Sequence, residues 1–388
     1  MNPMKTTDKN ISRRDRIRGC LIGGAAGDAL GYAIEFCGEE EIFSRFGRPG
    51  ITEYERDAHT GPALISDDTQ MTLFTAEGLL AAGVGEKYPE DRTRMRHTVA
   101  RAYQDWLRTQ EMSWEEARKV LAAETGREEC DGQSGQPGQD EAGPPLRLAL
   151  IPDLYSPRAP GNTCLSALRG QRRMHHLPED FIREPQNHSK GCGGIMRVAP
   201  LGLCCPAEAA ENVAWEGAQI AAITHGGLLG YMSAAVAAQI IHRLVFGPDG
   251  LSLKEIVREA RETAAGLFRG YQDLEVLLRI IDLALELSGN TAPDLENIHR
   301  LGEGWVAEET LGIALYCALR HTDDFSAALT AAVNHRGDSD STGAVTGNIL
   351  GALHGYDALD DKWKTGLELH GVILRLADAL AGPAESQR

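Results

Sequence analysis

The chain has 388 residues, 42% of them hydrophobic and 24% charged, proportions typical of a soluble globular protein with one large domain or two ordinary ones. Its formal net charge of −17 argues against nucleic acid as a required partner, because proteins that bind phosphate backbones present a basic face. The charge does not exclude small anionic molecules as ligands, since one local pocket can attract them.

The first predicted helix, "GCLIGGAAGDALGYAIEF" at 19–36, carries small residues that would let it pack closely against a neighbour. Within it, Asp28 is expected to make a structural hydrogen bond to a neighbouring loop. Glu35 follows two helical turns later on the same face, where its carboxylate could point at a metal cavity.

Apolar residues at three- and four-residue intervals predict the further helices, and no alternating strands separate them. We therefore expect an all-α protein. One helix begins with a capping-box pattern of Ser113 and Glu116. The segment at about 125–145 is rich in Gly, Gln, Pro and acidic residues, so it should be a mobile insertion that does not divide the chain. These further helices are predicted at 69–83, 96–110, 113–124, 209–223, 274–288, 307–321 and 345–355.

The longest apolar run, 221–241, is interrupted by His225, a Gly pair and Gln239. A buried helix explains it better than a membrane span, and no membrane partner is expected. The eight cysteines form no C-x-x-C pair, which is typical of reduced thiols in a cytosolic protein. The N-terminal stretch lacks the apolar core of a signal peptide, so we expect a cytoplasmic location.

The stretch "SDDTQ" places Ser66, Asp67 and Asp68 before an apolar-periodic helix. Capping of the helix N-terminus explains one aspartate well and two adjacent ones less well. Farther on, "GDSDSTG" places Asp338 and Asp340 before another helix. An EF-hand loop starting at Asp338 would need a glutamate at its twelfth position, which is Ile349.

If the two motifs meet in space, four carboxylates converge on one point. Their mutual repulsion would be severe in a dry site, and one or two divalent cations would offset it. Hard oxygen ligands of this kind suit Mg²⁺, Mn²⁺ or Ca²⁺.

The loop "NHSKGCGGIMRVAPLGL" contains Gly191, Gly193 and Gly194, whose backbone N–H groups could approach an anionic ligand. A plain turn is the equal alternative. His225 in "ITHGG" lies near the start of a predicted buried helix, where a histidine is more often a satisfied core residue than a ligand contact.

In their order along the chain, "GDALGYAIEF", "SDDTQ", "SKGCGGIMRVAP", "ITH" and "GDSDSTGAVTGNILGALHG" resemble the motifs of ADP-ribosylglycohydrolases. The resemblance covers about 14–380 and implies a compact all-α single domain with a two-metal cleft. It also implies a centre of two Mg²⁺ or Mn²⁺ ions. The metal ligands that it implies are Ser66, Asp67, Asp68, Asp338, Asp340 and Ser341.

The resemblance further implies that Glu35 lies beside the ribose and that Asp68 and Asp338 take part in catalysis. It places the diphosphate and distal ribose at 191–194, where many members have asparagine instead of Cys192. His225 would line the same cleft, which favours a functional role for it. The implied substrate contacts are Gly191, Cys192, Gly193, Gly194 and His225.

The implied reaction is hydrolysis of the bond between ribose C1 and a protein or small-molecule acceptor, with release of ADP-ribose and an oxocarbenium-like transition state. A catalytically weak or inactive ADP-ribose-binding or structural protein on the same fold is the main alternative. A two-metal phosphoesterase is a third, although such sites usually add several histidine ligands. The acceptor and the oligomeric state stay open.

Overall fold

The computed structural model describes residues 11–56, 61–125, 147–248 and 250–382. Within these residues the protein is helical, with no strand and two isolated bridges, which join Ala63 to Leu367 and Gly191 to Val306. The all-α prediction is therefore confirmed. The predicted insertion at about 125–145 lies almost entirely outside the described residues.

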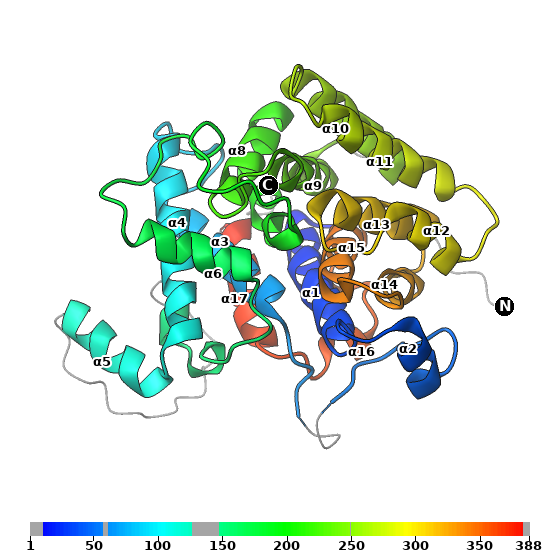
Figure 1. Cartoon of the computed structure of the whole chain (residues 1–388), viewed down its shortest axis with the longest axis horizontal. Helices are drawn as coiled ribbons and strands as arrows, with labels where there is room; N and C mark the ends of the chain where they lie inside the picture. Colours follow the sequence, from blue (N-terminus) through cyan, green and yellow to red (C-terminus); the bar gives the residue numbers. More distant parts are fainter. Residues whose placement is uncertain (1–10, 57–60, 126–146, 249, 383–388) are drawn as a thin grey trace.

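The described part of the chain contains seventeen α-helices (Figure 1). In order they are α1 (Arg13–Tyr32), α2 (Glu39–Phe46), α3 (Asp67–Ala81), α4 (Arg92–Glu111), α5 (Trp114–Thr125), α6 (Asn162–Gln171), α7 (Ala199–Gly202), α8 (Ala210–Ala222), α9 (Leu228–Phe246), α10 (Leu253–Leu267), α11 (Leu274–Leu287), α12 (Asp294–Leu301), α13 (Ala307–Arg320), α14 (Phe325–Val333), α15 (Ser339–His354), α16 (Asp361–Lys364) and α17 (His370–Ala381).

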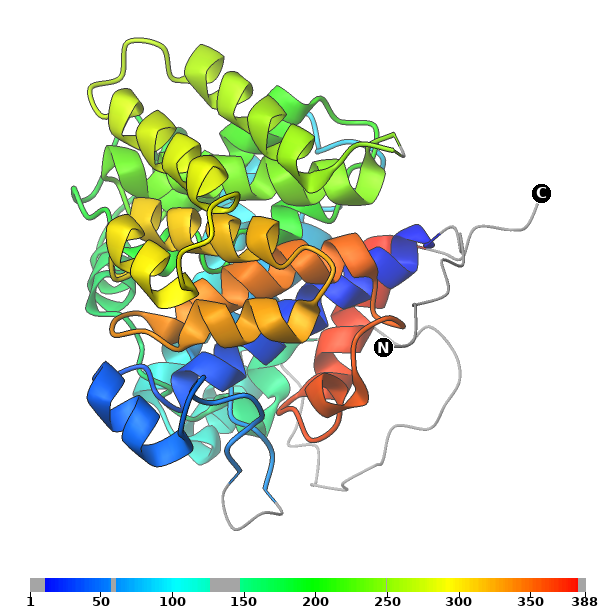
Figure 2. The same ribbon diagram turned by 90° about the vertical axis from the view of Figure 1, so that its right-hand side faces the viewer.

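Helices α1 and α15 run side by side through the middle of the molecule, and the other helices pack around them (Figures 1 and 2). Buried apolar side chains from most of the helices join one continuous hydrophobic core. The capping box predicted for α5 is present: Glu116 N–H donates to Ser113 Oγ at 3.3 Å, and Ser113 N–H donates to Glu116 Oε2 at 3.0 Å.

The closeness of α1 and α15 depends on glycines that recur every four residues on both helices. A Cβ atom added at Gly27 would lie 2.0 Å from the carbonyl oxygen of Gly343, well inside van der Waals contact. At the end of the row, a Cβ at Gly31 would lie 2.2 Å from the carbonyl oxygen of Ser339. The predicted close packing is therefore confirmed, and it brings the first turn of α15 beside the end of α1.

Helix α1 ends earlier than its periodicity predicts. Its last helical residue is Tyr32, and Ile34 N–H donates to the Gly31 carbonyl at 2.9 Å in the turn that follows. The prediction that Glu35 lies in a helix two turns from Asp28 is therefore wrong. The turn buries Ile34 and lets the ring of Phe36 stack on Trp305, in the loop before α13. Such tertiary contacts outweigh helix propensity.

The apolar run 221–241 does not form one helix. Helix α8 ends at Ala222 and α9 begins at Leu228, so His225 lies in the link between them. The backbone of 187–189 packs against this link: a Cβ at Gly227 would lie 2.6 Å from the Ser189 carbonyl oxygen. Among the described helices, α9 alone is long and apolar enough to cross a membrane, and 89% of its most apolar stretch is buried inside the protein.

Candidate active site

The first acidic motif forms the N-terminus of α3. Ser66 is the N-cap residue, and its Oγ accepts a hydrogen bond from the backbone N–H of Asp68 at 3.1 Å. Asp67 and Asp68 occupy the first helical turn rather than preceding the helix, where the helix dipole favours negative charge. Both side chains are at least 96% buried, so capping alone does not account for them.

Asp28 of α1 holds this turn in place. Its carboxylate accepts hydrogen bonds from the backbone N–H of Ser66 at 3.0 Å and of Thr69 at 3.1 Å, and also from the Thr69 hydroxyl. The structural hydrogen bond predicted for Asp28 is therefore confirmed, and its partner is the start of α3.

The second acidic motif forms the N-terminus of α15. Asp338 is the N-cap residue and accepts from the backbone N–H of Ser341 at 3.4 Å, while Asp340 lies in the first turn. The Asp338 N–H donates to the Glu303 carbonyl at 2.8 Å, which ties the motif to the loop before α13. Ser341 is 1% exposed and lies in the same turn.

The two motifs and Glu35 form one cluster. Carboxylate oxygens of Glu35, Asp338 and Asp340 lie within 4.8 Å of one another, and none of these residues is more than 8% exposed. After burial, the charge of Asp340 is the largest influence on the pKa of both Asp67 and Asp68. The two predicted motifs therefore meet in space, although their role as metal ligands stays a prediction.

Burial and mutual repulsion disfavour the charged forms of these carboxyl groups. Burial first, and the charge of Asp340 second, raise the pKa of Asp67, Asp68 and Asp338 well above the ordinary value. The same causes raise the pKa of Glu35 to about 9. In the protein without bound cations, the cluster is therefore electrostatically strained.

The cluster fits a divalent cation. Its donors are carboxylate and hydroxyl oxygens, the set that Mg²⁺ and Mn²⁺ prefer. Two buried oxygens, Glu35 Oε2 and Asp68 Oδ2, have no hydrogen-bond partner in the described part of the chain. Unpaired buried acceptors are rare in folded proteins, and here they lie where a cation would satisfy them.

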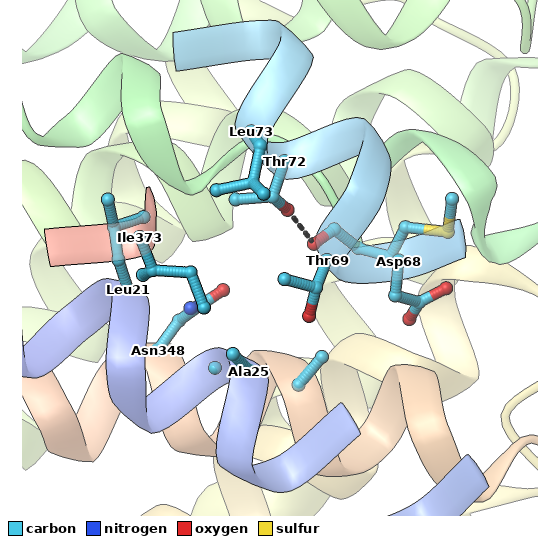
Figure 3. A pocket seen from close by; sticks show the side chains of 11 residues that line it. Leu21, Ala25, Asp68, Thr69, Thr72, Leu73, Asn348 and Ile373 are labelled. Carbon is cyan, nitrogen blue, oxygen red and sulfur yellow. Dashed lines mark hydrogen bonds between the residues drawn. The ribbon is translucent and has the colours of Figure 1, made fainter. Parts of the chain in front are cut away.

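Behind Asp68 lies a small cavity, about 10 Å³ in volume, with room for one water molecule at most. Figure 3 shows it enclosed by Thr69 and Leu73 of α3, Ala25 of α1 and Asn348 of α15. This cavity is too small for a substrate, so any ligand must approach the cluster from elsewhere.

The glycine loop lies against His225. A Cβ at Gly193 would lie 2.6 Å from His225 Cε1, so the absence of a side chain there admits the imidazole ring. Gly194 packs closely against α8: a Cβ added at Gly194 would lie 2.9 Å from the side chain of Ala221. The His225 ring is 2% exposed, and burial lowers its pKa to about 3, so it is neutral near pH 7.

Cys192 connects the glycine loop to the acidic cluster. Its thiol contacts the carboxylate of Asp338 and the hydroxyl of Ser341, and burial, followed by the charge of Asp338, raises its pKa. Gly191 pairs with Val306 in an antiparallel bridge, which fixes the loop against the start of α13. The predicted substrate contacts therefore adjoin the predicted metal ligands.

Sequence reasoning passed over two residues next to this site. Arg197 is fully buried directly after the glycine loop, and Thr224 joins it to His225. The available signal was a lone arginine in the otherwise apolar run "GGIMRVAPLGL", because an unpaired charge is rarely buried without a specific reason.

Comparison with known proteins gives a consistent result. A profile of the ADP-ribosylglycohydrolase family matches residues 9–388. The chain is 24% identical to ADP-ribosyl-[dinitrogen reductase] glycohydrolase of Rhodospirillum rubrum over 95% of this chain and 96% of that protein. It is also 24% identical to human ADP-ribosylhydrolase ARH3 over 91% of this chain and 89% of that protein.

A solved structure described as an ADP-ribosylglycohydrolase-related protein complex has the same fold. It matches 95% of this chain and 98% of its own with a TM-score of 0.56 and 23% sequence identity. At that identity the match speaks for the fold alone.

Proposed function

Because the chain belongs to the ADP-ribosylglycohydrolase family, we propose that it is a metal-dependent hydrolase that releases ADP-ribose from ADP-ribosylated proteins or small molecules. Family membership supports ADP-ribosyl hydrolase activity in general. The observation that carries the finer proposal is the buried cluster of Glu35, Asp338 and Asp340, together with the unpaired buried oxygens of Glu35 and Asp68. Such a cluster is a costly arrangement without a counter-charge.

We assign the cations to the two helix N-termini. Asp67 and Asp68 would hold one side of the centre, and Asp338 and Asp340 the other, with the Ser66 and Ser341 hydroxyls as further oxygen donors. Mg²⁺ or Mn²⁺, as a pair of ions, suits this donor set. When bound, the cations would supply positive charge that orients the ribose hydroxyls and eases deprotonation of water.

We assign the proton transfer to Glu35. Its carboxylate lies beside those of Asp338 and Asp340, and burial and the charge of Asp340 raise its pKa to about 9. Bound cations would offset this repulsion and favour the ionised carboxylate, which can accept a proton and later release it. In the proposed reaction, a water oxygen bonds to ribose C1 while the bond from C1 to the acceptor breaks. Glu35 takes the proton from water and passes it to the acceptor, which leaves as the neutral, protonated group.

The neighbouring carboxylates also suit the transition state. Positive charge develops at ribose C1 as the acceptor leaves, and Asp68 and Asp338 lie in the cluster that would face it. The Gly191–Gly194 loop and His225, which adjoin the carboxylate cluster, would bind the diphosphate of the substrate. The two proposed halves of the substrate site would then lie on adjoining segments.

The competing functions are less well supported. An inactive binding protein would have no need to keep all four motif aspartates buried together. In the phosphoesterase alternative, the candidate histidine ligand is His335, which shortly precedes the second acidic motif in the sequence. Both of its ring nitrogens already lie within 2.9 Å of backbone carbonyl oxygens, those of Arg336 and Ala332, so it has no nitrogen to offer a metal.

The test is a panel of defined substrates with ADP-ribose linked to arginine, serine, a nucleobase or a small molecule, assayed with Mg²⁺, with Mn²⁺ and with EDTA. Release of ADP-ribose from at least one substrate, only with a metal, supports the proposal. Binding of ADP-ribose without turnover of any substrate would favour the inactive relative.

A further inference from the structure

Within the described part of the chain, Arg197 carries a buried charge that has no carboxylate partner. The residue is 0% exposed, its guanidinium lies 4.5 Å from the centre of the Tyr103 ring, and its Nε has no hydrogen-bond partner within the described residues. Its remaining contacts are to uncharged atoms, including Met71 Sδ at 3.6 Å and Cys164 Sγ at 3.5 Å. Burying an unpaired cation is costly, so its position needs an explanation.

A structural role explains part of this position. Arg197 Nη2 donates to the carbonyl oxygens of Ile220 at 3.3 Å and Ala221 at 3.4 Å, in the last turn of α8. A cation at a helix C-terminus is stabilising. These two contacts are long, and the shortest one that Arg197 makes is to Thr224 Oγ1, at 2.7 Å.

The contact with Thr224 determines where the hydroxyl proton goes. A guanidinium only donates, so Thr224 Oγ1 must accept from Arg197. The same oxygen lies 2.8 Å from His225 Nδ1. The alternative acceptor for the hydroxyl proton is the thiol of Cys164, and sulfur accepts hydrogen bonds more weakly than an imidazole nitrogen.

Donation from Thr224 to Nδ1 leaves the single ring proton of neutral His225 on Nε2. That nitrogen faces the glycine loop, because a Cβ added at Gly193 would lie 3.0 Å from it and one at Gly191 3.4 Å. An N–H donor therefore points at the loop, and the positive charge of Arg197 lies behind it.

We propose that Arg197 is a positioning residue that, through Thr224, fixes His225 as the Nε2–H tautomer and adds a buried positive charge behind the Gly191–Gly194 loop, so that a diphosphate ester binds there. The diphosphate part of this inference rests on the function proposed above. The tautomer part does not, because it concerns the protein without ligand.

The tautomer is tested by NMR on full-length, metal-free protein with ¹⁵N-labelled histidine, in which His225→Gln assigns the His225 signals. The expected result is the Nε2–H form in the wild type and a mixture of tautomers in Thr224→Val, with Thr224→Ser restoring the wild-type pattern. Thr346→Val is the matched control, since Thr346 is equally buried and its hydroxyl bonds to Thr342 within its own helix. An Nδ1–H form in the wild type, or no change in Thr224→Val, overturns the inference.

The electrostatic part is tested by calorimetry with ADP-ribose in the presence of Mg²⁺. Arg197→Met is expected to weaken ADP-ribose binding at least about tenfold while Mg²⁺ affinity stays unchanged, and Arg197→Lys should recover part of the loss. Wild-type affinity in Arg197→Met would show that Arg197 only caps α8. If Arg197→Met does not fold, Arg197→Gln, which also removes the charge but keeps an N–H donor for Thr224, carries the same measurement.

A wild-type protein that shows the Nε2–H tautomer but does not bind ADP-ribose would overturn the proposed function and the diphosphate assignment. The positioning chain from Arg197 to His225 would still be supported. Failure of the proposed function and failure of the positioning inference therefore give different experimental results.

Discussion

The carboxylate of Asp28, on α1, accepts hydrogen bonds from both the backbone N–H and the hydroxyl of Thr69, on α3. The same carboxylate accepts the backbone N–H of Ser66 at 3.0 Å. One fully buried side chain thus fixes the first turn of α3 against α1. The positions of Asp67 and Asp68 depend on it, although Asp28 belongs to neither acidic motif.

We expect Asp28→Ala to lower the free energy of unfolding by about 2–4 kcal/mol, because each buried donor left unpaired costs about 1–3 kcal/mol and relief of repulsion offsets part of this. Mg²⁺ affinity should also fall, since the first turn of α3 loses its anchor. Urea unfolding and metal calorimetry measure the two effects. The exposed acid Glu40 supplies the control, Glu40→Ala, and equal behaviour of the two variants would contradict the anchoring role.

The glycine row between α1 and α15 gives a second prediction. Gly27→Ala places a methyl group 2.0 Å from the Gly343 carbonyl oxygen, so the helices must separate. We expect a loss of at least about 3 kcal/mol in the free energy of unfolding, at or beyond the usual upper end for overpacking. Gly170→Ala is the matched control: Gly170 also lies within a helix, nothing surrounds its Cβ position, and alanine there should stabilise by up to about 1 kcal/mol. Similar unfolding midpoints for both variants would refute the steric argument.

The pH dependence of stability should reveal the strained cluster. The raised pKa of Glu35, about 9 against an ordinary 4.5, means that the folded state keeps a proton that the unfolded state has lost. Stability of the metal-free protein should therefore fall as pH rises through this window, by about 1.4 kcal/mol per pH unit for each proton retained.

Thermal unfolding in EDTA measures this slope, and saturating Mg²⁺ should flatten it because the cation replaces the protons as counter-charge. Asp340→Asn should also flatten the slope in EDTA, since it removes the negative charge that helps to raise the pKa of the other carboxyl groups. A metal-free protein that is more stable near pH 9 than near pH 5 would show that the carboxyl groups are not strained.

Glu35 gives the prediction closest to the chemistry. Glu35→Gln keeps the size of the side chain but removes its charge and its ability to transfer a proton. We expect ADP-ribose affinity to stay within a few-fold and turnover to fall by about 10²–10⁴, the range usual for an acid–base group.

Because Glu35 lies close to Asp338 and Asp340, calorimetry with Mg²⁺ must accompany the kinetics. Weakened metal binding with near-normal turnover at saturating Mg²⁺ would assign Glu35 to the cations instead of the proton transfer.

Much of the local structure follows from the sequence. The periodicity of 69–83 and 307–321 predicts α3 and α13 to within a few residues, because an apolar stripe at helical spacing must be buried against a neighbour. The helix ends were predicted less well. Glu35 lies beyond the end of α1, since the packing of Ile34 and the stacking of Phe36 on Trp305 stop the helix in a way that local composition does not encode.

The helical class and the acidic character of the site can be predicted from the sequence, because helical spacing and the residue types of "SDDTQ" and "GDSDSTG" are local properties. Which acids meet, and which residues hold them, follows from the packing of the helices. Asp28 anchors α3 from 38 positions upstream of Ser66, and Arg197 reaches His225 through a hydroxyl on another loop. Contacts of this kind depend on how helices distant in sequence pack, and side-chain periodicity within one helix carries no record of its neighbours.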